Sequence, residues 1–206
     1  MSFSEYHFGG TAGCNTFGGL GLLADQHFAI HSWSSTLIGC HDEMGRQEQA
    51  ISKLFFARPR VTALETNRVR IASSEHKLEL ERVGSDKSAP VPAGPQELTN
   101  TNWQIVMMDG EEASANPTGR ILSFSTGKWR GMASCATLYG TWRRHGDRLM
   151  VDEEIATTEQ NCRPDHARID KNFADLMRSS PRYLVGPNGE LLIAGGGHAL
   201  AGGRRD

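Results

Sequence analysis

The chain contains one pattern twice, and this internal repeat limits its fold more than any other feature of the sequence. Residues 8–19 return as residues 129–140, at a constant offset of 121. From Thr36, which corresponds to Thr158, the offset is 122, and it holds through the rest of the repeat. Self-similarity of this length and order indicates a duplicated domain rather than one large domain.

Length and composition agree with two small soluble units. The 206 residues divide into units of roughly eighty to one hundred residues, each long enough to bury a core. Hydrophobic residues make up 38% of the chain, and no apolar run is long enough to cross a bilayer. The formal net charge of −2 argues against nucleic acid as the main partner.

Residue spacing and turn signals predict the elements of the first unit. A helix is expected over residues 42–57, because acidic residues favour its start and Pro59 ends it. Its residues Ile51, Leu54 and Phe55 form one apolar stripe. Strands are predicted at residues 2–4, 8–14, 27–33, 61–64, 69–71 and 78–80.

The second unit repeats this order but opens with a strand, residues 102–107, that the first unit lacks. Its helix begins at Pro164, since proline is tolerated in a first turn, and stops before Pro181. The buried stripe of this helix is expected to be Ile169, Phe173, Leu176 and Met177. The other predicted strands are residues 121–124, 128–135, 149–151, 183–185 and 191–193. The glycine-rich end, residues 195–206, is predicted to fray.

These elements predict three segments along the chain. Residues 1–83 form the first repeat and residues 98–206 form the second. Residues 84–97 hold three prolines and no periodicity, so they are expected to form an extended linker. Antiparallel order is expected within each unit, because the connections are too short for parallel strands.

The missing strand predicts an exposed edge in the first unit. The sequence starts at a position that corresponds to the second strand of the second unit, and no signal segment opens it. The missing strand and the missing signal segment would both be explained by an upstream leader that carries the first strand. Alternatively, the first unit forms without that strand. Unpaired edges invite pairing, so we expect the second unit, or a partner chain in a symmetric homodimer, to cover this one.

The order of motifs resembles the META domain, the family of the HslJ-type heat-shock lipoproteins. Its marks are a tryptophan strand, a phenylalanine strand, a Gly-x-x-Gly-Cys-Asn segment, a Thr-x-x-x-Cys segment before a helix, and a final hairpin. The second repeat matches at Trp103, Phe124, Gly131, Cys135, Thr158 and Cys162. The first repeat matches at Gly10, Gly13, Cys14, Asn15, Thr36 and Cys40.

The resemblance implies a fold and a compartment more than a chemistry. It implies two α+β units, each a curled antiparallel, barrel-like sheet with one packed helix. The family is largely exported or membrane-anchored in bacteria, is tied to stress or antibiotic tolerance, and has no established enzymatic activity. In the second repeat Ser134 and Ala136 replace the family's glycine and asparagine, so any role of that asparagine is confined to Asn15.

The four cysteines are the strongest chemical signal in the sequence. Cys14 and Cys40 recur as Cys135 and Cys162, and an even count at repeated positions suggests pairing within each repeat. The family's two cysteines are thought to pair as well. Buried free thiols in a cytoplasmic protein, and a metal or redox site, are the alternatives.

Other chemistry has weaker support in the residues. Zinc sites use closely spaced cysteine pairs, which this sequence lacks, so no metal or other cofactor is expected. Cys40 beside His41 suggests a thiol enzyme, but neighbours on a strand point to opposite faces and catalysis needs a unique constellation. His76 and His198 recur at predicted hairpin turns, where a polar turn residue is the ordinary interpretation.

We therefore expect a non-enzymatic bacterial envelope protein, periplasmic or associated with the outer membrane, with a binding or scaffold role in stress or antibiotic tolerance. Its partner would be an envelope protein or a small ligand. A small-molecule or peptide-binding module with a groove between the repeats is the main alternative, a thiol-dependent enzyme is the third, and a cytoplasmic location remains open.

Overall fold

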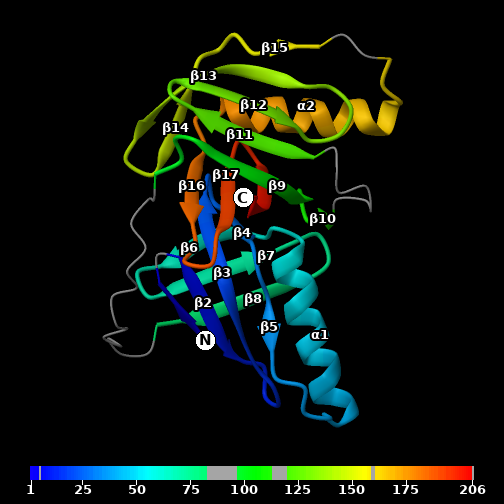
Figure 1. Ribbon diagram of the computed structural model, residues 1–206. Helices are drawn as coiled ribbons and strands as arrows, with labels where there is room; N and C mark the ends of the chain where they lie inside the picture. Colours follow the sequence, from blue (N-terminus) through cyan, green and yellow to red (C-terminus); the bar gives the residue numbers. More distant parts are fainter. Residues whose placement is uncertain (5, 83–96, 113–119, 159–160, 206) are drawn as a thin grey trace. The chain divides into compact units, whose positions relative to one another are not determined.

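The computed structural model describes the chain except residues 5, 83–96, 113–119, 159–160 and 206 (Figure 1). The chain divides into two compact units, Met1–Pro92 and Ala93–Asp206, called unit 1 and unit 2 below. Each unit has an antiparallel sheet and one helix of 15 residues, which confirms the predicted α+β class. The predicted linker, apart from its last residue, lies outside the described residues.

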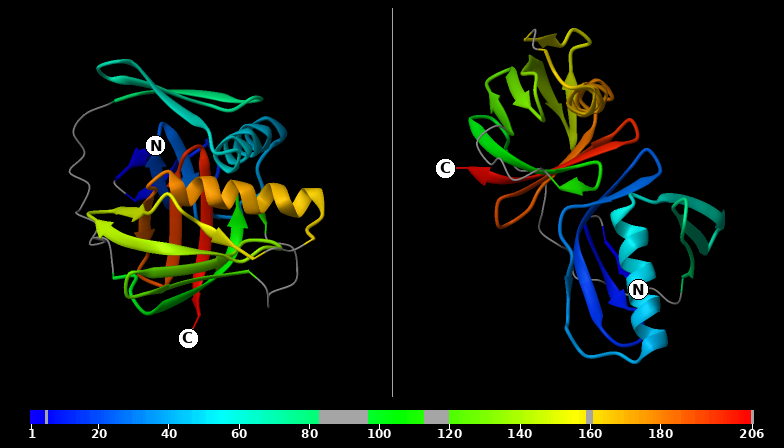
Figure 2. Two further views of the ribbon diagram at one scale, coloured as in Figure 1. Left: turned by 90° about the horizontal axis from the view of Figure 1, so that it is seen from above. Right: turned by 90° about the vertical axis from the view of Figure 1, so that its right-hand side faces the viewer.

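Unit 1 is an open curled sheet with one helix. The strands pair in the order β1-β2-β3-β4-β6-β7-β8, and β5 pairs with β3. Figure 2 shows the sheet curling around α1, with β1–β3 and β6–β8 on different sides of it. The elements are β1 (Ser2–Phe3), β2 (His7–Thr11), β3 (Thr16–Ala24), β4 (His27–Ile30), β5 (Ser34–Ser35), α1 (Asp42–Phe56), β6 (Arg60–Glu65), β7 (Arg68–Ala72) and β8 (Lys77–Glu81).

Unit 2 has the same order of elements and two additional strands at its start, β9 and β10, of which β9 closes the sheet. That strand, β9 (Thr101–Met108), pairs with β11 on one side and with β18 on the other, so eight strands form a closed barrel. The other elements are β10 (Glu111–Glu112), β11 (Ile121–Ser125), β12 (Lys128–Met132), β13 (Leu138–His145), β14 (Arg148–Val151), β15 (Ala156–Thr157), α2 (Pro164–Arg178), β16 (Arg182–Val185), β17 (Glu190–Gly195) and β18 (His198–Arg205).

The helix stripes predicted from the sequence are buried. In α2, Phe173, Leu176 and Met177 are fully buried in the barrel, and Ile169 is packed against the same core. The ring of Phe173 lies so close to Gly131 that a Cβ there would be 2.6 Å from it, which explains the glycine on β12. No helix of the described residues is long and apolar enough to cross a membrane.

Aromatic rings fill the smaller core of unit 1. Leu54 and Phe55 of α1 are buried, and Ile51 is partly buried beside them. Phe8 stacks on Phe55 with ring centroids 5.2 Å apart and meets Phe28 edge-on at 5.4 Å. Such pairs add to the hydrophobic burial of the rings.

The prediction that residues 195–206 fray is wrong. β18 spans His198–Arg205, and its residues Ala199, Leu200 and Ala201 are buried between β17 and β9. Glycine is required rather than destabilising here, because a Cβ on Gly202 would lie 2.9 Å from the carbonyl oxygen of Gln104 on β9.

Several strand boundaries and several whole strands also differ from the predictions. β2 ends at Thr11 and β12 ends at Met132, so Cys14 and Cys135 lie in bends and not on strands. β3 and β13 were not predicted, because glycines interrupt their apolar pattern. The bends matter for the site described next.

The helix stripes generate a stability prediction. We expect Leu54→Ala and Leu176→Ala each to lower the free energy of unfolding by about 2–5 kcal/mol, because each removes a side chain that is at most 1% exposed and leaves a cavity. Chemical unfolding of the full chain measures this, with the exposed Lys53→Ala as a control. An unchanged unfolding midpoint in either leucine variant would contradict the assignment of that helix face.

Candidate functional site

A disulfide, a helix carboxylate and a threonine hold one bend of the chain in each unit, and we call this arrangement the hub. Cys14 is bonded to Cys40 in unit 1, and Cys135 is bonded to Cys162 in unit 2. The Cα atoms of the two pairs are 6.1 and 5.9 Å apart. The structure therefore joins the cysteines within each repeat, and none of the four is free.

The carboxylate of the hub comes from the same helix position in both units. Glu48 on α1 accepts hydrogen bonds from the backbone N–H of Asn15 and, at 2.9 Å, from its side-chain Nδ2. Asp170 on α2 accepts from the backbone N–H groups of Cys135 and Ala136 at 3.1 and 2.8 Å. In both units an acidic side chain thus satisfies backbone donors of the bend beside the disulfide.

The threonine that matches the family motif closes the other side of the hub. The Oγ1 atom of Thr36 accepts from the backbone N–H of Thr16 at 3.1 Å, and Thr158 does the same for Thr137 at 3.0 Å. These equivalent bonds join the segment before the helix to the start of β3 or β13. The threonines therefore act by positioning the chain.

Asn15 gives the hub of unit 1 a network that unit 2 does not share. Its side chain is buried, and its Oδ1 accepts from Thr36 Oγ1 and from the backbone N–H of Ile38, both at 2.8 Å. Its Nδ2 also donates to the Ile38 carbonyl at 3.1 Å. The methyl group of Ala136 at the equivalent position cannot make these hydrogen bonds. Only Asn15 can form this side-chain network, as expected from the sequence.

Hydrogen bonding favours the charged form of Glu48. The side-chain bond from Asn15, followed by the bond from its backbone, lowers the pKa of the Glu48 carboxyl below its ordinary value. At neutral pH the hub of unit 1 therefore contains a carboxylate whose negative charge is held by two donors of one residue.

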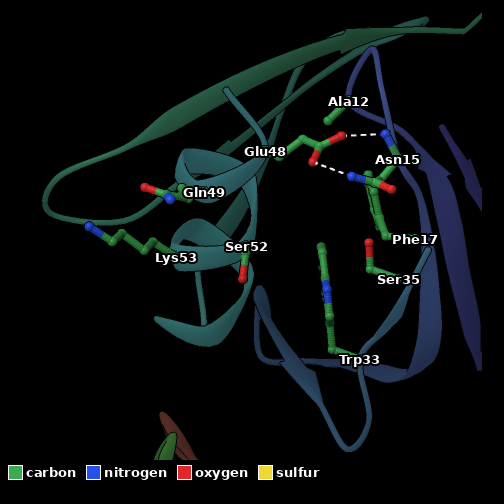
Figure 3. A pocket seen from close by; sticks show the side chains of 9 residues that line it. All are labelled: Ala12, Asn15, Phe17, Trp33, Ser35, Glu48, Gln49, Ser52 and Lys53. Carbon is green, nitrogen blue, oxygen red and sulfur yellow. Dashed lines mark hydrogen bonds between the residues drawn. The ribbon is translucent and has the colours of Figure 1, made fainter. Parts of the chain in front are cut away.

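A cleft of about 290 Å³ lies beside the hub of unit 1 (Figure 3). Figure 3 shows the Trp33 indole edge-on, with Phe17 and Ser35 on one side, Ser52 of α1 on the other, and Glu48 above. Phe17 stacks on Trp33 with centroids 4.6 Å apart. Phe17 thus covers one face of the indole. The indole lines the cleft, and the rings of Phe55 and Phe56 on α1 lie near it, with centroids 5.9 and 6.1 Å away.

The equivalent positions in unit 2 are less polar. By the register of β5 and β15, Trp33 corresponds to Ile155, which is packed against the core of unit 2. Ser52 corresponds to the buried Ala174, and Asn15 to Ala136. The aromatic face and the hydroxyl group are therefore particular to unit 1.

The donor sets of the hubs do not suit a metal ion. Among the described residues, the groups close enough to share an ion are Cys14, Cys40 and Glu48, and their counterparts Cys135, Cys162 and Asp170. A metal takes a thiolate, whereas these sulfur atoms are bonded to each other. His41, the neighbour of Cys40, is exposed and occupies the N-cap position of α1, without a side-chain capping hydrogen bond, instead of lying on a strand.

The comparisons with known proteins agree with the duplicated architecture. The model of the META domain matches residues 1–85 and again residues 96–206. The chain belongs to the META domain family. Both matches together cover almost the whole sequence, which is the tandem arrangement expected from the internal repeat. No curated protein matches the chain.

Solved structures that are similar to this chain share little sequence with it. An NMR structure of a protein from Burkholderia xenovorans is 20% identical, covers 61% of this chain and 98% of its own, and has a TM-score of 0.48. A DUF4847 family protein from Bacteroides vulgatus is 17% identical, with coverage of 53% and 96% and a TM-score of 0.37. A DNA polymerase sliding clamp from Pseudomonas aeruginosa is 12% identical, with coverage of 99% and 56% and a TM-score of 0.23.

The sequence singled out the cysteines, Asn15 and the two threonines, but it missed the two carboxylates that hold the bends. Glu48 and Asp170 lie at the same offset as the other repeated residues, and this was the available signal. An acidic residue on a helix is normally a solvated surface group, so its contact with the bend became visible only in the structure.

The Glu48 network predicts a pH dependence of unit 1. Because its folded-state pKa is lowered, the charged carboxylate stabilises unit 1 above the ordinary glutamate range, and this stability is lost as the pH falls through that range to the lowered pKa. We expect Asn15→Ala to raise the pKa of Glu48 toward its ordinary value and Glu48→Gln to remove this pH dependence. NMR titration of the side-chain carboxyl carbon measures the first effect, and a pKa of Glu48 unchanged by Asn15→Ala would contradict the account.

Proposed function

We propose that this chain is a non-enzymatic protein of the bacterial cell envelope, periplasmic or associated with the outer membrane, that acts through binding or as a scaffold. The observation that carries the proposal is one disulfide in each unit at equivalent positions. Disulfides persist in oxidising compartments and are rare in the cytoplasm of most organisms. The resemblance to the HslJ-type proteins supports a role in stress or antibiotic tolerance.

The chemistry of the hubs supports a role without catalysis. The four sulfur atoms are bonded in pairs, so they offer no thiolate for attack on a substrate in this state. Glu48 and Asp170 use their carboxylates to accept bonds from the bends. The most reactive side chains of the repeated motif are thus occupied in holding the fold.

A small-molecule binding role is the second candidate, and the cleft of unit 1 favours it. The groove expected from the sequence was between the repeats, whereas this cleft lies within one unit. The indole of Trp33 and the hydroxyl group of Ser52 together suit a flat molecule that carries a hydrogen-bonding group.

The compartment is tested by the oxidation state of the cysteines in living cells. We expect a membrane-permeant alkylating reagent, added to intact cells of the native bacterium, to leave all four cysteines unmodified until a reductant is added. Peptide mapping of the unreduced protein should link Cys14 with Cys40 and Cys135 with Cys162. Modification of all four cysteines without reductant would contradict the envelope assignment.

The cleft is tested with matched variants of the two repeats. In an NMR-detected screen of small aromatic compounds against the full chain, we expect Trp33→Ala to weaken binding of any compound in the cleft by about tenfold or more, because it removes the stacking face. Ile155→Ala, at the equivalent position of unit 2, should leave binding unchanged. Equal binding to wild type and Trp33→Ala would exclude the cleft as the site.

A further inference from the structure

The barrel of unit 2 is completed by β9, and the way β9 is held defines a strand-binding position. β9 pairs antiparallel with β11 on one edge and along most of its length with β18 on the other. Its side chains alternate, so that Trp103 and Ile105 are buried in the barrel. The indole nitrogen of Trp103 donates to Thr101 Oγ1 at 2.8 Å, which satisfies its polar group inside the core.

The end of β9 is held by a carboxylate. Asp109 follows the strand with a φ of 57°, a conformation that aspartate tolerates better than most residues. Its Oδ2 lies 2.9 Å from His198 Nδ1 and accepts from Asn172 Nδ2 at 2.9 Å, while Oδ1 accepts from the backbone N–H of Ala199 at 3.0 Å. These contacts join the strand end to both α2 and β18.

Unit 1 has the strands that correspond to the neighbours of β9, but among the described residues no strand lies between them. Its sheet ends at β1 and β8, which correspond to β11 and β18, and among the described residues β8 pairs with β7 alone. His76 and Lys77 stand at the positions of His198 and Ala199. Within the described part of the chain, the buried Nε2 atom of His76 has no hydrogen-bond partner.

A cavity marks the same place. It has a volume of about 350 Å³ and lies between α1 and the start of β8, lined by Ile51, Leu54, His76, Lys77 and Leu78 among others. The counterparts of His76 and Lys77 in unit 2 are the residues that hold Asp109. The cavity of unit 1 is therefore where the end of β9 lies in unit 2.

Burial at equivalent positions shows how much apolar surface the missing strand leaves uncovered. Leu200 is fully buried, whereas its counterpart Leu78 is only partly buried. The core of unit 1 is thus incomplete along the side that β9 closes in unit 2.

We propose that unit 1 binds an extended segment of another protein as an added β-strand, in the position that β9 occupies in unit 2. Main-chain hydrogen bonds to β8 would provide much of the affinity, and alternating side chains would provide the specificity. The segment that fits carries a large apolar residue facing the core, a second apolar residue two positions later, and a carboxylate at the end that reaches His76. This pattern is Trp103, Ile105 and Asp109 of the chain itself.

The occupant is a different protein rather than a second copy of this chain. The strand of the chain that carries the matching pattern is β9, and both of its edges are already paired within unit 2. Donating it would open the barrel and expose Trp103. The inference goes beyond the proposed role in the envelope, and it depends neither on the compartment nor on the cleft beside Trp33.

The test uses a fluorescent peptide with the sequence of residues 101–109 as the probe and the full chain as the receptor. We expect saturable binding by fluorescence anisotropy, about tenfold or more weaker when the peptide carries W103A. Replacing the terminal aspartate by asparagine should weaken binding to the wild-type protein. This preference for aspartate should disappear in the His76→Ala protein, whereas the exposed Lys53→Ala variant should bind the peptide normally.

The location of the bound peptide shows whether it pairs with β8 of unit 1 or replaces β9 in unit 2. A peptide with a photoreactive group at the position of Gln104 should cross-link to residues 77–81 of β8. Cross-links to β11 or β18 would mean that the peptide replaces β9 in unit 2, and this would overturn the proposal. It would also be overturned if no saturable binding occurred at about 1 mM peptide, or if the free protein were a dimer with β8 already protected from hydrogen exchange.

Discussion

A curled antiparallel sheet leaves two edges of unpaired backbone groups, and in this protein one strand decides whether those edges meet. In unit 2, β9 bonds to β11 and β18 and converts the sheet into a barrel. The burial of Trp103 and the contact of Asp109 with His198 both follow from that closure. In unit 1 the corresponding edges, β1 and β8, have no strand between them among the described residues.

The hubs show how two repeats keep one geometry with different residues. Glu48 has one more methylene group than Asp170, and it binds both the backbone and the side chain of Asn15. The shorter Asp170 binds two successive backbone N–H groups, at Cys135 and Ala136. Each carboxylate therefore suits the residue that follows the cysteine in its own repeat. Because buried backbone donors need partners, removing either carboxylate should loosen the bend beside the disulfide.

Much of this architecture could be predicted from the repeat, and the exceptions have physical causes. The helices and their buried stripes were predictable because apolar residues that recur with a period near 3.6 residues can be recognised directly in the sequence. β18 was missed because a glycine such as Gly202 normally weakens a predicted strand. Here a glycine is required, because β9 approaches this position closely. The contact of Asp109 with His198 joins residues far apart in the sequence, so it depends on a strand register that no local pattern records.

The same reasoning applies to the candidate sites. The cysteines were visible as repeated residues, whereas the cleft needs the stacking of Phe17 on Trp33 across two strands. Unit 1 has a cavity where unit 2 holds a strand end, and this difference lies in the spatial arrangement of the repeats and not in any local sequence pattern. The structural differences between the units thus come from substitutions and from one strand within a shared fold.

Residue-resolved amide hydrogen exchange of the free chain tests the unequal closure of the two units most directly. The account predicts slow exchange throughout the buried part of β18, because both of its edges are paired, and an alternating pattern in β8, where only the amides that face β7 are protected. Equal protection of every amide in β8 and β18 would contradict the account, because it would mean that the edge of unit 1 is already filled.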